Sequence, residues 1–149
     1  MAFMTWTQDL ELGIPEIDRQ HMRLVGLLNA LEAGVRDGYS RRILGSILTD
    51  LARYTVCHFT FEERLMETYR LPDSDEHKDE HRRLTADVLN FKMRFDVGRA
   101  DVSDELLRFL RDWLQGHILG TDRRLVAALL ERLDGASIPA MDDPTCCAA

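Results

Sequence analysis

The feature that most constrains the fold is a set of four long segments in which apolar residues recur at alternating steps of four and three. Such spacing places one apolar stripe on one face of an α-helix. Breakers and capping residues bound the segments, which run from Pro15 to before Gly38, from an N-cap at Ser40 to before Pro72, from a cap at Asp73 or Ser74 to about Gly98, and from about Ser103 onward. Short connections and the lack of strand patterns predict an all-α fold, an antiparallel up-down-up-down four-helix bundle. We expect residues 1–134 to form this domain, with Met1 to Glu16 as a non-helical arm and residues 135–149 as a flexible tail.

The fourth stripe changes register after His117. A regular helix continued from His117 would turn polar residues toward the core, whereas the apolar residues lie one position later, at Leu125 or Val126, Leu129 and Leu133. One extra residue is therefore absorbed before Asp122, either by a single-turn π-bulge, which we expect, or by the end of one helix and the start of another. In both cases Asp122 moves toward the face of His117, from which an ideal helix would hold it about 140° away. Gly116 and Gly120 flank the slip and are expected to ease the distortion.

Composition excludes several classes of function. The net charge of the 149-residue chain is −7, which is the wrong sign for a protein that must neutralise phosphates, so we expect no binding to nucleic acid. The N-terminal segment lacks the features of a signal peptide, and no run of about 18 apolar residues is present to span a membrane. We therefore expect a cytoplasmic monomer.

The three cysteines form neither a disulfide framework nor a C-x-x-C motif. Cys57 lies in an apolar helical pattern and is expected to be a small buried side chain. Cys146 and Cys147 lie in the tail, where we expect reduced and idle thiols, with crosslinking between molecules as the alternative.

Seven polar residues interrupt the apolar stripes. Buried imidazoles and carboxylates cost several kcal/mol unless they are paired or bind a metal, and these residues occur on all four helices and include every histidine of the chain. We interpret them as ligands: His21, His58, Glu62, His77, His81, His117 and Asp122. A structural zinc site takes only four ligands, so seven indicate two ions of higher coordination, and imidazole with carboxylate suits iron. Five histidines, two bridging carboxylates and one bridging oxygen leave one position of two octahedra open.

Apolar residues surround the expected open position. Phe59 follows His58, and Trp113, Leu114 and Ile118 bracket His117, so we expect these four to form an apolar pocket for a small diatomic ligand. We find no Ser, Thr, Tyr or Lys at a helical spacing that would make it a proton donor, which disfavours cleavage of an O–O bond. Glu63 is expected to be solvated or to lie just outside the ligands.

The motifs that carry these residues resemble those of the hemerythrins, specifically the single-domain bacteriohemerythrins. They are Trp6 with L-G-I-P-E-I-D-R-Q-H ending at His21, H-F-T-F-E-E from His58, H-K-D-E-H from His77 and W-L-Q-G-H-I-L-G-T-D from Trp113. The resemblance implies a non-haem di-iron centre with a bridging oxo or hydroxo group. One iron would be held by His77, His81 and His117 and the open iron by His21 and His58, with Glu62 and Asp122 bridging.

The same resemblance implies reversible O2 binding, for storage or for delivery to an oxygen-consuming enzyme, and no catalysis. Two alternatives use the same site. One is a di-iron enzyme, either a peroxidase or an NO-scavenging reductase, and the other is an oxygen or redox sensor that works with a separate partner. The sequence does not choose between storage and turnover, because both require the open position.

Overall fold

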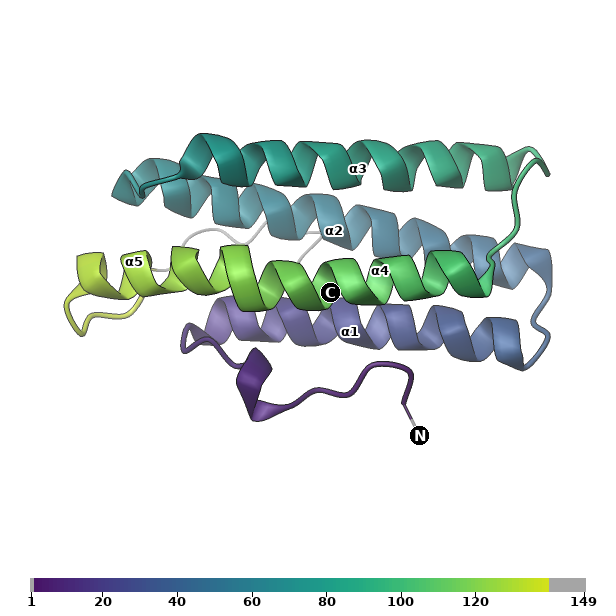
Figure 1. The fold of residues 1–149 in the computed structure, drawn as a ribbon, viewed down its shortest axis with the longest axis horizontal. Coiled ribbons are helices and arrows are strands. Elements are labelled where there is room, and N and C mark those ends of the chain that lie inside the picture. Colours follow the sequence, from purple (N-terminus) through teal and green to yellow (C-terminus); the bar gives the residue numbers. More distant parts are fainter. Residues whose placement is uncertain (1, 140–149) are drawn as a thin grey trace.

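The fold is a bundle of four long antiparallel helices, as predicted. A computed structural model of the protein describes residues 2–139. Within them the helices are α1 (Pro15–Arg36), α2 (Arg41–Tyr69), α3 (Ser74–Asp96) and a composite fourth helix made of α4 (Asp104–His117), the π-helical turn η2 (Ile118–Asp122) and α5 (Arg123–Leu133). The three parts of the fourth helix follow one line in Figure 1. No strand occurs in the described part of the chain.

Local signals in the sequence set most of the helix ends. Pro15 occupies the first turn of α1, and the hydroxyls of Ser40 and Ser103 accept hydrogen bonds from the backbone N–H groups of Ile43 and Leu106, so both serines are the expected N-caps. The start of α3 differs from the expectation. Asp73 adopts a left-handed conformation and makes no side-chain cap, while the hydroxyl of Ser74 donates backwards to the carbonyl of Leu71 at 2.6 Å.

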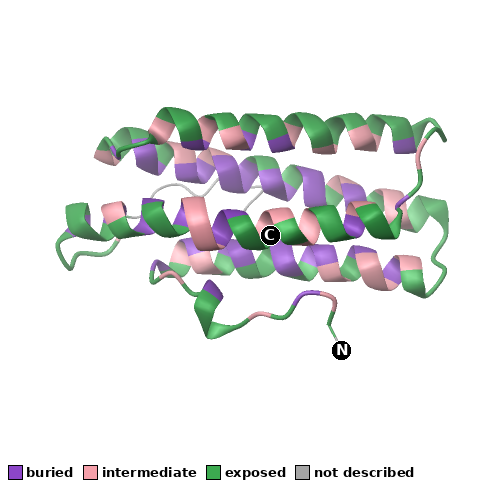
Figure 2. Cartoon of the chain, in the orientation of Figure 1, coloured by how far each residue is buried: buried purple, intermediate pink, exposed green. Residues whose placement is uncertain are grey.

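Two apolar clusters fill the core, one toward each end of the bundle. One contains Leu24, Leu28, Leu31, Leu51 and Leu107, and the other contains Ile17, Leu65, Met66, Val126 and Leu129. The buried faces of the helices point toward one another in Figure 2. Along α1, His21 lies between Ile17 of one cluster and Leu24 of the other. The buried polar layer that contains His21 therefore lies between the two apolar clusters.

The N-terminal arm lies along the bundle and is fastened to α1. The backbone N–H and C=O of Met4 both bond to the side-chain amide of Asn29, at 2.8 and 2.9 Å. The Asp18 carboxylate accepts from the N–H groups of Leu12 and Gly13. The arm is not entirely non-helical, because residues Gln8–Leu10 form one 3₁₀ turn that buries Leu10.

Two further expectations bear on the ends and the cysteines. Among the described residues, no helix is long and apolar enough to cross a membrane. Cys57 is buried as expected, but its sulfur is disulfide-bonded, so the interpretation as a simple packing residue is incomplete. The expectations for Cys146 and Cys147 lie outside the described residues, as does most of the predicted tail.

Candidate metal centre

All seven residues predicted as ligands converge on one point in the middle of the bundle. His21 comes from α1, His58 and Glu62 from α2, His77 and His81 from α3, His117 from α4 and Asp122 from η2. Each is at most 5% exposed. Their ligand atoms form two overlapping groups, one of His77, His81 and His117 and one of His21 and His58, and both carboxylates belong to both groups. We call these the three-histidine group and the two-histidine group.

The Glu62 carboxylate spans the two groups. Its Oε1 faces the Nε2 atoms of His58 at 2.7 Å and of His21 at 3.5 Å. Its Oε2 faces the Nε2 atoms of His77 at 3.2 Å and of His81 at 3.3 Å. One oxygen is thus directed to each group of histidines.

Asp122 repeats this division from the opposite side. Its Oδ2 lies 2.9 Å from Nε2 of His21, and its Oδ1 lies 3.0 and 3.1 Å from the Nε2 atoms of His77 and His117. Each of the two carboxylates thus presents one oxygen to each of the two histidine groups.

Asp122 reaches this position through a π-helical turn, which confirms the predicted bulge. Residues Ile118–Asp122 form the turn without breaking the helix, and the apolar residues of α5 are buried in the shifted register. The expected role of the glycines is not supported. A Cβ atom at Gly116 or Gly120 would meet no atom within 4 Å, and neither residue has a positive φ, so the turn requires neither small size nor left-handed freedom there.

The electrostatics of the site are dominated by burial opposed by the two carboxylates. Burial alone lowers the pKa of His21 and His77, but the close, negatively charged carboxylates of Asp122 and Glu62 outweigh it and raise both pKa values to about 9. Burial prevails at His58, whose pKa is lowered. Burial raises the pKa of Glu62, but His58, His21 and His77 reverse this effect and hold that pKa well below its usual value.

Several buried polar atoms of the site have no hydrogen bond within the described residues. These atoms are both carboxylate oxygens of Glu62 and of Asp122 and the Nε2 atoms of His21 and His77. The Nε2 atoms of His81 and His117 also face each other at 3.2 Å. Buried acceptors that converge without donors are costly in an apolar core. The residues therefore fit a site for cations, which would satisfy nitrogen and oxygen lone pairs together.

The outer nitrogens of the histidines face Gln20 and Glu80, which the sequence did not reveal, and Glu63, which it did. Gln20 Oε1 lies 2.7 Å from Nδ1 of His58, and Glu80 Oε2 lies 2.9 Å from Nδ1 of His117. Glu80 also accepts from the hydroxyl of Thr121 at 2.8 Å. Glu63, expected just outside the ligands, approaches Nδ1 of His81 at 3.8 Å. The contacts of Gln20 and Glu80, which are at hydrogen-bond distance, fix the ring orientation of His58 and His117 and the tautomer that presents Nε2 inward.

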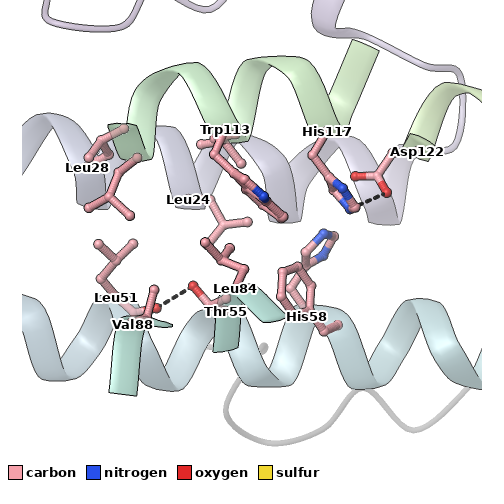
Figure 3. Close-up of a pocket in the computed structure, with 13 residues that line it drawn as sticks. Leu24, Leu28, Leu51, Thr55, His58, Leu84, Val88, Trp113, His117 and Asp122 are labelled. Carbon is pink, nitrogen blue, oxygen red and sulfur yellow. Dashed lines mark hydrogen bonds and ion pairs between the residues drawn. The ribbon is translucent and has the colours of Figure 1, made fainter. Parts of the chain in front are cut away.

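An apolar cavity of about 40 Å³ adjoins the cluster. Figure 3 shows the polar groups His58, His117 and Asp122 together at one end of it, with Trp113 and leucines from the other elements along its length. Phe59, Trp113 and Leu114 line the cavity as predicted. The cavity is also lined by residues that the sequence pattern does not single out: Leu24, Leu28, Leu51, Thr55, Leu84, Val88 and Leu110.

Two expectations for the pocket need correction. Ile118 is fully buried but belongs to the apolar core and is not among the residues that line the cavity. Thr55 does line it, although no hydroxyl was expected there. Its Oγ1 donates to the Leu51 carbonyl at 2.7 Å, so the hydroxyl hydrogen is already engaged.

Comparison with known families decides the relationship of the chain. Residues 12–129, a span that contains all seven clustered residues, match the family model described as the hemerythrin HHE cation binding domain. The chain belongs to the hemerythrin family. A bacteriohemerythrin of Stenotrophomonas maltophilia (strain R551-3) is 38% identical over 123 residues, which cover 83% of this chain and 79% of that protein.

Other hemerythrin relatives agree in sequence and in structure. A bacteriohemerythrin of Methylococcus capsulatus (strain ATCC 33009 / NCIMB 11132 / Bath) is 34% identical over 83% of this chain and 94% of its own length. A crystal structure of wild-type hemerythrin superposes with a TM-score of 0.82 at 32% identity, covering 86% of this chain and 98% of that one. The four-helix bundle is therefore the hemerythrin fold, and the description of the family as cation binding agrees with the chemistry of the buried cluster.

Proposed function

We propose that the protein is a reversible O2 carrier for oxygen storage or delivery, built on two non-haem iron ions with a bridging oxo or hydroxo group. His77, His81 and His117 would hold one iron, and His21 and His58 the other. Glu62 and Asp122 would bridge both, since each directs one oxygen to each histidine group. The two irons would supply electrons for reversible O2 binding by passing between ferrous and ferric states.

The observation that carries this proposal is the apolar cavity at the unequal histidine groups. With three nitrogens at one ion and two at the other, the ion held by His21 and His58 would have the open position, and the cavity reaches His58 as well as His117. About 40 Å³ has room for a diatomic molecule or for water. The bound ligand would lie among apolar side chains that exclude water.

The cavity also supports carriage over turnover. A reaction that cleaves the O–O bond requires protons, and a proton donor must lie within hydrogen-bond reach of the ligand. The hydroxyl of Thr55 is the one Ser, Thr or Tyr hydroxyl among the residues that line the cavity, and its hydrogen is engaged by the Leu51 carbonyl.

The test is an optical spectrum of the iron-loaded protein, reduced without air, exposed to O2 and then flushed with argon. We expect a charge-transfer band that appears with O2 and disappears on flushing over repeated cycles. Irreversible conversion to the ferric form in the first cycle contradicts carriage. Catalytic consumption of peroxide or NO, with a reductant supplied, favours the enzyme alternative.

Two variants test whether the cavity protects the site. Leu114→Ala enlarges the cavity beside the ligand position and is expected to speed conversion to the ferric form several-fold by admitting water. Ile118→Val is the matched control, because Ile118 is buried nearby but does not line the cavity. If Leu114→Ala and wild type convert to the ferric form at equal rates, residues other than Leu114 protect the site from water.

A further inference from the structure

The residues just outside the two histidine groups differ in charge. In the two-histidine group, Nδ1 of His58 faces the neutral amide oxygen of Gln20, and Nδ1 of His21 is buried with no hydrogen bond within the described residues. In the three-histidine group, Nδ1 of His81 is likewise buried with no hydrogen bond within the described residues, but Nδ1 of His117 faces the Glu80 carboxylate at 2.9 Å. One side of the centre is therefore supported by a carboxylate and the other by an amide.

This difference bears directly on metal binding. When Nε2 of a histidine faces a metal, Nδ1 carries the hydrogen and donates it to its outer partner. A carboxylate partner raises the basicity of the imidazole more than an amide does, and loss of such a partner weakens metal binding by about 10–100-fold. We therefore expect His117, with its carboxylate partner, to bind a metal ion more strongly than His58, with its amide partner.

Glu80 also holds the π-helical turn. The same oxygen that faces His117 accepts the Thr121 hydroxyl at 2.8 Å, so one carboxylate on α3 contacts the residue before the turn and a residue within it. His117 makes one of these contacts, and Asp122, which follows Thr121, faces His77 and His117 of the three-histidine group. Glu80 thereby fixes the distance between a histidine and a carboxylate ligand.

We propose that Glu80 is a positioning residue that makes the three-histidine position the tighter of the two metal sites, so that the chain loads in order, with the ion at His77, His81 and His117 first. The proposal rests on the two-metal centre proposed above and not on O2 binding. Because the Glu80 side chain is 42% exposed, solvent screens its longer-range field, and the effect acts through its hydrogen bond to His117.

The test follows the filling order in the metal-free full-length protein with Zn²⁺ as the probe. Titration against a competing chelator gives the two affinities, and NMR of the histidine ring nitrogens reports which rings are coordinated. After one equivalent we expect metal-bound shifts at His77, His81 and His117 and free-ring signals at His21 and His58. The reverse order overturns the proposal.

Glu80→Gln removes the charge and keeps the shape and an acceptor oxygen. We expect the affinity of the tighter metal site to fall by about 10–100-fold. The first equivalent of Zn²⁺ should then distribute over both sites. Glu76→Gln is the matched control, because Glu76 is exposed one turn away on α3 and lines the same small polar cavity beside His77 and Glu80. Equal weakening by both variants means a general field effect and rejects the role of Glu80.

A second variant keeps the test decisive if Glu80→Gln destabilises the fold, which the thermal midpoint of the metal-free protein reports. Glu80→Asp retains the charge but withdraws the carboxylate by one methylene, so the tighter step weakens if the hydrogen bond acts and is unchanged if charge alone acts. A total of one ion per chain would contradict the two-iron centre itself. Two ions that bind in the opposite order reject the inference about Glu80 and leave that centre intact.

Discussion

The second and the fourth helix each direct one histidine and one carboxylate to the centre, but with different spacing along the sequence. α2 presents His58 and Glu62 four residues apart on a regular α-helix, and the fourth helix presents His117 and Asp122 five residues apart across η2. A turn with i to i+5 hydrogen bonds returns residue i+5 to about the place that residue i+4 has in an α-helix. The two pairs therefore differ in their spacing along the sequence, but each places a histidine and a carboxylate side by side on the inward face of its helix.

The two helices should tolerate a change of length differently. Residues on both sides of the pair in α2, such as Phe61, Leu65 and Met66, are buried in the regular register. In the fourth helix the π-helical turn η2 already contains the one extra residue, and the buried apolar residues of α5 lie on the same face of the helix as Asp122. The strongest experiments add a residue to one helix or remove one from the other.

Insertion of an alanine between Thr60 and Phe61 is expected to have the largest effect. In a regular helix it rotates Glu62, Leu65 and Met66 by about 100° away from their present positions. Because each lost apolar contact of this size costs about 2–5 kcal/mol, we expect loss of at least about 5 kcal/mol of stability and of metal binding. Iron content and chemical denaturation measure both. Two irons retained per chain would show that α2 also accepts a π-helical turn.

The carboxylates of the two helices act on the same imidazoles, so the metal-free protein should be sensitive to alkali. The folded pKa values of His21 and His77 are raised from 6.5 to about 9. Their stabilisation is therefore fully present below pH 6.5 and is lost as pH rises through about 9, by about 3 kcal/mol for each histidine. The lowered pKa of His58 acts outside this window, because that imidazole costs stability only as pH falls below about 6.5. Chemical denaturation at several pH values across this window measures the loss.

Metal loading should invert this dependence, because metals bind deprotonated histidines and release protons. Asp122→Asn should flatten the alkaline loss more than Glu62→Gln, since the close carboxylate of Asp122 is the largest influence that raises the pKa of both histidines. Stability of the metal-free protein that stays constant or rises from pH 6.5 to 9 would contradict the assignment.

The sequence predicted most of the fold and the inward-facing cluster because these depend on spacing along single helices. His58 and Glu62 share a face by spacing alone, and the slip after His117 follows from the register of Leu129 and Leu133. The outer contacts of Glu80 could not be predicted in this way. Glu80 is one of many acidic residues on the polar side of a helix, and its contact with His117 depends on how α3 packs against the fourth helix.

The pocket illustrates the same limit. Ile118 was predicted to line it because it adjoins His117, yet a neighbour in sequence lies about 100° around the helix and here it joins the core. Thr55 was missed because a threonine among apolar residues carries no signal of a cavity. Which residues beside a ligand line the cavity depends on how the helices pack together.

Deletion of Gly120 is the converse of the insertion and should have a modest effect. It makes the spacing of His117 and the aspartate four, as in α2, and keeps the apolar stripe of α5 in phase with His117. We expect a folded protein that still binds two metal ions, with a change of about 1 kcal/mol because the hydrogen bond from Thr121 to Glu80 is lost. Unfolding, or loss of one ion, would show that the π-helical turn itself is required.

Gly116→Ala should have the smallest effect and the opposite sign. Gly116 is exposed within α4, its φ is not positive, and a Cβ atom would meet nothing within 4 Å. Alanine in an exposed helix is favoured over glycine by about 0.5–1 kcal/mol, so the thermal midpoint should rise without change in metal content. Gly13→Ala is the matched control, since φ of +107° at Gly13 strains any other residue and should lower the midpoint. A fall of the midpoint in Gly116→Ala would mean that the π-helical turn depends on glycine freedom one residue before His117, and the fourth helix would then differ from α2 in its chemistry as well as in its spacing.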